Sequence, residues 1–356
     1  MKRGERLRGV LRRTALRALK GCGAFHLVRD SDWRRQRLLI LCYHGISLED
    51  EHEWRPYLFI RPEQLERRLE ILRKNNYTVL PLGEALERFY RQELPARSVV
   101  LTFDDGTYDF YRQAYPRISK FGFPVTVYLT TEYSELQLPV FGLICSYMLW
   151  KARDRGACDL REVGGCERVS LDSAREREDA ASQIAQKADA QGLSALQKDE
   201  IARRLAELLK IDYSELSGKR ILQLMNQKEI TELAGAGVDF QLHTHRHCVP
   251  LNENLFRKEI TDNRQHIARS VAGERKHFCY PSGAYRPEFL QWLAAESVVS
   301  ATTCDTGLVT AQSNPLLLPR LVDTTGRTEL EFESWISGIG HFLSSHKKAR
   351  LAYAGD

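Results

Sequence analysis

The sequence predicts an α/β protein in which helices cover a parallel β-sheet. Short apolar runs rich in β-branched residues alternate along the chain with amphipathic stretches of helical length. The apolar runs lack the strict polar alternation that is typical of strands in an all-β sandwich. We therefore expect a parallel sheet that is either open or closed into a barrel.

The first half of this alternation runs from residue 38 to residue 131. The helix expected at 61–76 has Pro62 near its start, where a missing backbone N–H is tolerated. In chain order we expect strand 38–47, helix 61–76, strand 77–82, helix 83–92, strand 97–103, helix 107–122 and strand 124–131.

Residues 151–225 interrupt the alternation with a charged segment rich in Ala, Gln and Glu, which we interpret as a helical insertion. The alternation then resumes with a helix in which Asn226 and Glu229 form a capping box. The later elements are helix 226–237, a strand that runs into a loop at 238–247, helix 252–273 and a strand and turn at 276–283. The predicted division is an arm at 1–37, a body at 38–345 that contains the insertion, and a tail at 346–356.

The composition suits one large or two modest globular domains. The 356 residues are 43% hydrophobic and 28% charged. The longest apolar run, at 138–150, is shorter than the roughly 20 residues of a membrane span and contains Pro139 and Gly142. Eight cysteines are scattered without C-x-x-C pairs, and no secretory signal is recognisable, so we expect free thiols in a cytoplasmic protein.

The arm at 1–37 is strongly basic. It holds 12 Lys and Arg but three Asp and Glu, a net charge of +9, whereas the rest of the chain carries −4. The acidic body argues against nucleic-acid binding. Within residues 1–25 an amphipathic helix is expected, which either lies on anionic lipid at the inner membrane face or packs on the body. Its helically spaced apolar and small residues are Leu7, Val10, Leu11, Thr14, Ala15, Ala18 and Cys22.

Asp104 and Asp105 follow the apolar run that ends at Phe103. Adjacent carboxylates repel each other, and neither is buried without cost unless it has a partner. Each motif alone also fits a solvated loop or a surface tract, but His243 and His247 follow another predicted strand. Because parallel α/β folds build their sites at strand ends, we expect these groups to meet.

Two histidines and one aspartate form a ligand set that suits zinc or another divalent transition metal and leaves coordination positions open. A water on such a metal becomes a nucleophile near neutral pH, and the second aspartate is then placed to take its proton. This division of work explains why two carboxylates stand side by side.

These residues resemble the motifs of the polysaccharide deacetylase family. TFDDG at 102–106 is followed by HTHRH at 243–247, and the similarity covers about residues 38–325, including LCYHGIS near the start and FCYPSGAY at 278–285. The resemblance implies a distorted (β/α) barrel. It also implies a metal-dependent hydrolase that removes acetyl groups from sugars.

The resemblance also implies roles for individual residues. Asp104 corresponds to the catalytic base, and Thr244 to a hydroxyl that supports its loop. His245 is no ligand in this pattern and either lines the groove or is exposed. The implied ligands of a divalent metal, expected to be Zn²⁺, are Asp105, His243 and His247. The implied oxyanion and substrate residues of the third motif are Tyr280, Pro281 and Ser282, with the backbone N–H at Ser282.

The sequence departs from the family pattern at three places. Cys279 replaces an arginine that orients the catalytic aspartate, and a later Asp-Trp element is not recognisable. Pro319 and Arg320 stand where the family has the histidine that acts as general acid. We hypothesise that Arg320 reaches Asp104 in place of the lost arginine, although a guanidinium keeps its proton and is no acid. We interpret His44 as a core histidine with satisfied hydrogen bonds, with a place near the site as the alternative.

The leading functional hypothesis is a metal-dependent deacetylase acting on N-acetylated sugars of a polysaccharide or of a lipid-linked glycan precursor. Two alternatives stay open. A non-catalytic glycan-binding protein is favoured by the missing histidine and opposed by the intact aspartate pair. A hydrolase of a non-sugar amide on the same fold is the other.

Overall fold

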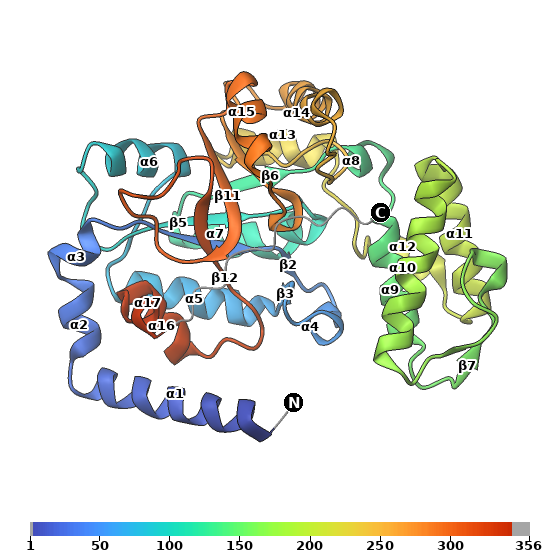
Figure 1. Cartoon of the computed structure of the whole chain (residues 1–356), viewed down its shortest axis with the longest axis horizontal. Helices are drawn as coiled ribbons and strands as arrows, with labels where there is room; N and C mark the ends of the chain where they lie inside the picture. Colours follow the sequence, from blue (N-terminus) through green and yellow to red (C-terminus); the bar gives the residue numbers. More distant parts are fainter. Residues whose placement is uncertain (1–2, 344–356) are drawn as a thin grey trace.

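Seven parallel strands close into a barrel in the computed structural model, which describes residues 3–343 (Figure 1). The strands are β1 (Leu39–Tyr43), β5 (Ser98–Phe103), β6 (Thr126–Leu129), β9 (Asp239–Leu242), β10 (His277–Cys279), β11 (Ser300–Thr306) and β12 (Leu318–Val322). Around the ring they follow the order β1, β12, β11, β10, β9, β6 and β5, and β5 pairs again with β1. The predicted (β/α) barrel is therefore confirmed.

Alternate residues of each strand point into the barrel or toward the helices around it. Leu39 and Leu41 of β1 belong to the largest hydrophobic cluster, which the surrounding helices share. Ile40 lies in another cluster, together with Val100, Tyr128, Cys279 and Leu318 from four other barrel strands. The same alternation places the side chain of Asp104, four residues after Val100, on the inner side.

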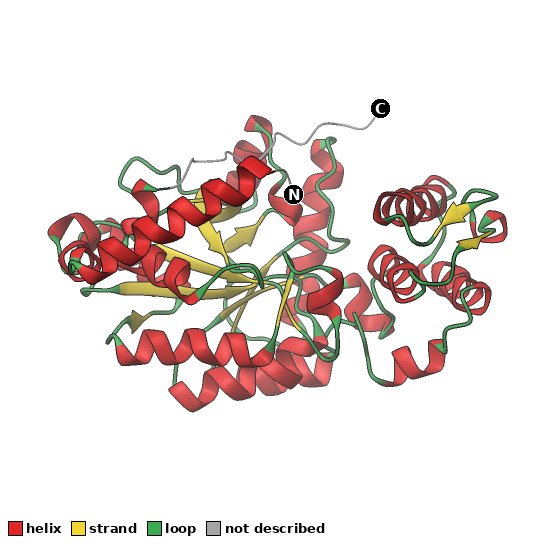
Figure 2. Ribbon diagram, turned by 90° about the horizontal axis from the view of Figure 1, so that it is seen from below, coloured by secondary structure: helices red, strands yellow, loops and turns green. Residues whose placement is uncertain are grey.

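Helices that follow the strands cover the outside of the barrel (Figure 2). They are α5 (Pro62–Lys74), α6 (Leu82–Tyr90), α7 (Tyr115–Phe121), α13 (Gln227–Gly235), α14 (Glu253–Ala268), α15 (Pro287–Ala295) and α16 (Glu329–Ser337). The capping box predicted for Asn226 and Glu229 is present at the start of α13. Shorter connecting elements are β2 (Gly45–Ile46), α4 (Glu51–Trp54), β3 (Phe59–Ile60) and α8 (Glu132–Leu136).

Two predicted elements differ from the structure. The strand expected at 77–82 is regular only in β4 (Thr78–Val79), because Pro81 already caps α6. The helix expected at 107–122 begins with a π-helical turn (Phe110–Ala114) before α7. Pro116 lacks the N–H that would bond to the carbonyl four residues earlier, which explains the break in the α-helical ladder.

A group of helices lies beside the barrel, on the right in Figures 1 and 2. It consists of α9 (Phe141–Lys151), α10 (Ala174–Ala190), α11 (Ala195–Leu208) and α12 (Tyr213–Gly218), with the small hairpin β7 (Ala157–Cys158) and β8 (Val169–Ser170). These elements share a hydrophobic cluster that is separate from that of the barrel. The apolar run at 138–150 forms most of α9, which packs against α10 and α11, so the helical group begins before residue 151.

Three helices precede the barrel: α1 (Arg3–Gly21), α2 (Ala24–Arg29) and α3 (Asp32–Arg35). Leu16 and Phe25 pack with Ile339 of α17 (Ile339–Phe342), and α1 and α2 contact α16. Within residues 3–343, no helix is both long and apolar enough to cross a membrane. The predicted tail at 346–356 lies outside the described residues.

Candidate active site

The two aspartates lie just beyond β5, at the carboxyl ends of the barrel strands. The N–H of Asp104 donates to the carbonyl of Tyr43 at 2.9 Å, so pairing with β1 continues one residue past the strand. Asp105 then adopts a left-handed conformation, with φ 70°. The turn therefore keeps Asp104 inside the barrel and places Asp105 beside the histidines that follow β9.

Asp105 lies between two histidines. Its Oδ1 is 3.1 Å from Nε2 of His243 and 3.1 Å from Nε2 of His247. His243 follows β9 directly, and its Nδ1 lies 2.8 Å from the carbonyl oxygen of Cys279. Nδ1 is thus the donor to this carbonyl, so Nε2 is the nitrogen that binds a cation in the neutral ring or donates to Asp105 in the protonated ring. Thr244 and His247 have positive φ angles, so the chain turns back and brings the two rings to 5.0 Å.

This group fits a divalent cation. One ligand atom from each of Asp105, His243 and His247 lies within 4.8 Å of the others. The Asp105 and His247 side chains are 24% and 36% exposed, so the group is open on one side. Burial opposes ionisation of Asp105, but the two imidazoles outweigh it and hold its pKa well below the usual range. A carboxylate with two imidazoles is a ligand set that zinc accepts.

Arg320 holds Asp104, as hypothesised from the sequence. Its Nη1 donates to Oδ1 and its Nη2 to Oδ2, both at 2.7 Å, and the two side chains are almost completely buried. Nε donates to the carbonyl of Thr303 at 2.9 Å, which fixes the guanidinium plane. Burial raises the pKa of Asp104, but Arg320 outweighs this effect and keeps that pKa below its usual range. Asp104 is therefore ionised.

Cys279 leaves room for this arginine. Its Sγ is 3.1 Å from Nη2 of Arg320 and 3.5 Å from Oδ2 of Asp104. A larger side chain at this position would occupy the volume that the guanidinium fills. The small residue on β10 and the arginine on β12 thus form a matched pair. Cys42 lies on the other side, with Sγ 3.6 Å from Oδ2 of Asp104. Burial raises the pKa of both thiols.

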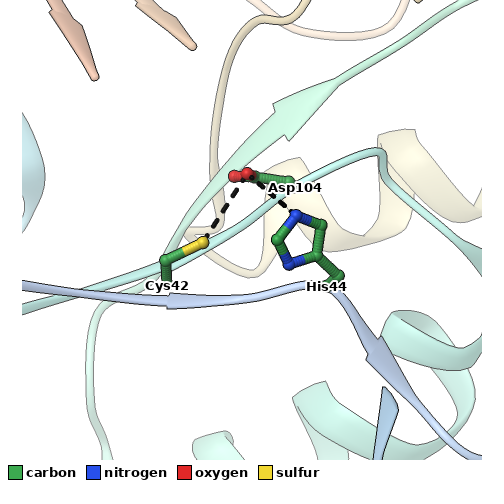
Figure 3. Close-up of side chains that lie close together, drawn as sticks. All are labelled: Cys42, His44 and Asp104. Carbon is green, nitrogen blue, oxygen red and sulfur yellow. Dashed lines mark hydrogen bonds and ion pairs between the residues drawn. The ribbon is translucent and has the colours of Figure 1, made fainter. Parts of the chain in front are cut away.

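His44 lies next to Asp104 (Figure 3), with Nε2 3.5 Å from Oδ2. Its Nδ1 is buried and has no hydrogen-bond partner in the part of the chain that the structure describes. The interpretation of His44 as a satisfied core histidine is therefore wrong. Burial lowers its pKa, although Asp104 and Asp105 oppose this effect. Because Tyr43 pairs with Phe103, His44 and Asp104 are the next residues on neighbouring strands. Each residue directly follows an apolar run, but the sequence does not give the register that brings them together.

Two further groups of potential ligands also lie near Asp104, namely Cys42, His44 and Asp104, and Asp104, His243 and Cys279. In both, the carboxylate of Asp104 is already neutralised by Arg320. A cation there would compete with a buried guanidinium. The group around Asp105 is consequently the candidate metal centre.

The family follows from comparison with known proteins. A family model described as polysaccharide deacetylase matches residues 91–160 and 179–298, more than half of the chain. The chain belongs to the polysaccharide deacetylase family. Members of this family are hydrolases that act on carbon–nitrogen bonds. The matched residues include both aspartates and the histidines after β9, but neither His44 nor Arg320.

A known protein matches part of the chain. A poly-β-1,6-N-acetyl-D-glucosamine N-deacetylase of Escherichia coli (strain K12) is 28% identical over 99 residues, which are 28% of this deacetylase-family chain. The chain spans only 14% of the length of that relative.

Solved structures show the shared fold. The Streptococcus pyogenes deacetylase PplD in complex with acetate has a TM-score of 0.54 at 20% identity, covering 82% of this chain and 94% of that one. IcaB from Ammonifex degensii has a TM-score of 0.52 at 16% identity, covering 85% and 97%. At these identities the likeness concerns the fold alone.

The third motif of this deacetylase-family chain follows β10. The Tyr280 ring lies in the large cluster between barrel and helices, and its hydroxyl donates to the carbonyl of Leu316 at 3.1 Å. Pro281 is buried, whereas Ser282 is exposed and has a φ of 56°. The structure therefore gives the Tyr280 side chain a packing role and leaves the Ser282 backbone as the part of the motif at the surface.

His245 points away from Asp105. It is 8% exposed, its Nδ1 lies 2.8 Å from Oγ1 of Thr131, and its ring stacks on His266 at 4.5 Å. It is thus neither exposed nor part of the ligand group. The Thr244 hydroxyl accepts a hydrogen bond from the N–H of Cys248 at 3.1 Å, consistent with its predicted support of the loop.

Asp109 is a buried carboxyl group that the sequence reasoning missed. Its Oδ1 accepts hydrogen bonds from the N–H of Ile46 and from Oγ1 of Thr107, both at 3.0 Å. It thereby ties the segment after His44 to the turn after Asp105. Burial raises the pKa of Asp109 to about 8.

Asn263 on α14 supports the candidate metal centre from behind. Its Oδ1 accepts from the N–H of His243 at 3.0 Å. Its Nδ2 donates to the carbonyl of Leu129 at 2.9 Å and to Oγ1 of Thr131 at 3.1 Å. The sequence pattern did not indicate this residue, because its three partners lie at or just after the ends of β6 and β9, outside its own helix.

Replacing Asn263 with leucine is expected to weaken zinc binding by about 10–100-fold, since the backbone that carries His243 loses its anchor. The free energy of unfolding should fall by about 1–3 kcal/mol, because buried polar groups lose their partners. Calorimetric zinc titration and urea unfolding measure the two effects. The matched control is Asn252→Ala, which removes the cap of the same helix and should leave zinc affinity unchanged. Equal losses of affinity in both variants would contradict the anchoring role.

Proposed function

We propose that the protein is a metal-dependent deacetylase that removes acetyl groups from N-acetylated sugars of a glycan. The observation that carries this proposal is the open ligand group around Asp105 with an ionised, buried carboxylate, Asp104, next to it. The name of the E. coli relative supports poly-N-acetylglucosamine as the class of substrate. A lipid-linked precursor at the inner membrane face belongs to the same proposal and is supported by the basic arm.

The chemistry divides between a bound cation and the side chains around it. Asp105, His243 and His247 would hold a divalent cation, which would supply Lewis-acid chemistry for the attacking water and the acetamide carbonyl. Asp104 takes one proton from the attacking water, and Arg320 keeps Asp104 ionised and oriented for that transfer. The carbonyl carbon then gains a bond to the water oxygen.

The leaving nitrogen needs a proton before the carbon–nitrogen bond breaks. Arg320 does not release one, so it cannot replace the missing histidine of the family. His44 is placed to do so, because its Nε2 lies 3.5 Å from Oδ2 of Asp104. The proton taken by Asp104 has a short path to His44 and from there to the nitrogen. The products are a free amine and acetic acid, which releases the second water proton to become acetate.

Replacing His44 with glutamine is expected to lower kcat by about 10²–10⁴-fold, the contribution typical of general acid catalysis. Zinc content and the free energy of unfolding should change little, because the ring binds no metal in the proposed site and its Nδ1 has no partner to lose. The pH profile of kcat should lose the limb that reports the acid. The control His26→Gln alters an exposed histidine and should keep full activity. An active His44→Gln enzyme would exclude this role.

The deciding experiment measures acetate release from an N-acetylglucosamine oligomer before chelation, after chelation and after zinc is restored. We expect chelation to abolish acetate release and zinc to restore it. We also expect that His247→Ala binds no zinc. Bound zinc without release from any acetylated glycan would favour a glycan-binding protein or a hydrolase of another amide. A chain that binds no zinc would rule out the proposed centre.

A further inference from the structure

The N-terminal helix turns an apolar side away from the barrel. Leu16 is fully buried and Leu19 partly buried in the contact with the body, which defines the inner side of α1. Thr14 and Ala18 are each two residues from Leu16, or about 200° around the helix axis. They belong to an exposed row, here called the outer stripe, that consists of Val10, Leu11, Thr14, Ala18 and Cys22.

The outer stripe is made of the residues whose spacing first indicated an amphipathic helix. Val10 is 51% and Leu11 61% exposed. The contact with the body uses Leu16, together with Phe25 and Ile339, and none of the stripe residues. Packing on the body therefore does not explain why this side of the helix is apolar. Scattered exposed apolar residues are ordinary, but a row along one side of a helix indicates a surface that something else covers.

Positive charge borders the outer stripe. Arg13 and Arg17 are exposed, and neither has an ion-pair partner among residues 9–343, whose side chains the structure describes. Lys20, by contrast, is bound to Glu333 of α16 and so belongs to the contact with the body. The two free guanidinium groups lie one turn apart on the same flank. An apolar row bordered by arginines is the pattern of a helix that lies in a membrane interface.

We infer that α1 docks the protein on an anionic lipid surface, with the outer stripe at the boundary of headgroups and acyl chains and with Arg13 and Arg17 at the lipid phosphates. Figure 1 shows α1 along the outer edge of the molecule, away from the helical group α9–α12, and the stripe residues are exposed. The inference does not depend on the proposed deacetylase activity.

Charge argues against two other partners for the outer stripe, namely a second copy of the chain and the C-terminal segment. A second copy that docked stripe against stripe would bring two arms of net charge +9 against each other. The C-terminal segment 344–356 holds three Lys and Arg but one acidic residue, so it also repels the arginines. Anionic lipid is the partner that neutralises both flank arginines while covering apolar side chains.

The test is sedimentation of the full-length protein with vesicles of phosphatidylglycerol and phosphatidylcholine, compared with vesicles of phosphatidylcholine alone. We expect binding to the anionic vesicles, weakened by salt. Leu11→Asp and the double variant Arg13→Glu/Arg17→Glu should each reduce binding by about tenfold or more, because both the apolar and the electrostatic contributions are needed. The controls Leu196→Asp and Arg175→Glu alter an exposed leucine and an exposed arginine of the helical group and should bind like the unmodified chain.

Three outcomes would overturn the inference: no binding to anionic vesicles, equal binding to neutral ones, or unchanged binding by both Leu11→Asp and Arg13→Glu/Arg17→Glu. Concentration-dependent dimers that Leu11→Asp abolishes, without vesicle binding, would instead assign the stripe to a second copy. Thermal unfolding and acetate release from a soluble oligomer, both measured without vesicles, should be the same for every variant. A loss of release in all proteins would concern the proposed activity and not the docking surface.

Discussion

Replacing Arg320 with methionine is expected to lower the free energy of unfolding by about 3–5 kcal/mol at neutral pH, as in other proteins in which one partner of a buried ion pair is removed. Both carboxylate oxygens of Asp104 bind this guanidinium, and the pair is almost completely buried. Without it, an ionised carboxylate stays in the barrel beside two histidines, His44 and His243, and two thiols. Urea unfolding of the full chain measures the effect.

The pH dependence of this loss gives a second, sharper readout. In the native protein the pKa of Asp104 lies below its usual range, so its stabilising contribution is present above the unfolded value of about 3.9 and disappears as the pH falls through the folded value. In the methionine variant burial is no longer offset by Arg320, and the pKa of Asp104 rises. The stability difference between the two proteins should therefore shrink as the pH is lowered.

Two control variants test whether the lost stability comes from the unpaired buried charge. The double variant Arg320→Met/Asp104→Asn removes both charges and should recover part of the lost stability. Arg175→Met breaks an exposed pair with Asp179 and should change the free energy of unfolding by less than about 1 kcal/mol. If Arg320→Met also lowered the free energy of unfolding by less than about 1 kcal/mol, the pair would not stabilise the barrel. The same would follow if the double variant recovered no stability.

Replacing Asp104 with asparagine is expected to lower the rate of acetate release by at least about 10²–10⁴-fold, because the base that takes the proton from water is lost. The asparagine oxygen still accepts one hydrogen bond from Arg320, so the side chain keeps its place. Zinc affinity should be retained, since the three proposed ligands are untouched. Release and zinc content are measured on the same preparation, below its unfolding temperature.

The neighbouring aspartate provides the matched comparison. Asp105→Asn should lose zinc binding and acetate release together, because its Oδ1 is the atom between the two imidazoles. The pair of variants therefore distinguishes a base from a ligand within one dipeptide. Zinc loss in Asp104→Asn with zinc retention in Asp105→Asn would reverse the two assignments.

Much of the barrel could be predicted from the sequence because periodicity reports which residues share a face within one element. The apolar runs marked β1, β5, β6, β9 and β10, but no strand was predicted where β11 and β12 lie. Asn226 with Glu229 marked the start of α13. The aspartate pair and the histidines after β9 were found because each motif follows its own strand. The contact between Arg320 and Asp104 could also be predicted, because Cys279 replaces the arginine of the family motif and Arg320 was a candidate to take its role.

Only the tertiary structure decided how separate elements meet. His44 reaches Asp104 because β1 and β5 pair in one register, and Asn263 anchors His243 because α14 crosses behind β9. The inner and outer sides of α1 were settled by its contact with α16, which buries Leu16 and leaves the stripe outside. A local pattern shows that a helix has an apolar side, but which side is buried depends on the surface against which the helix packs.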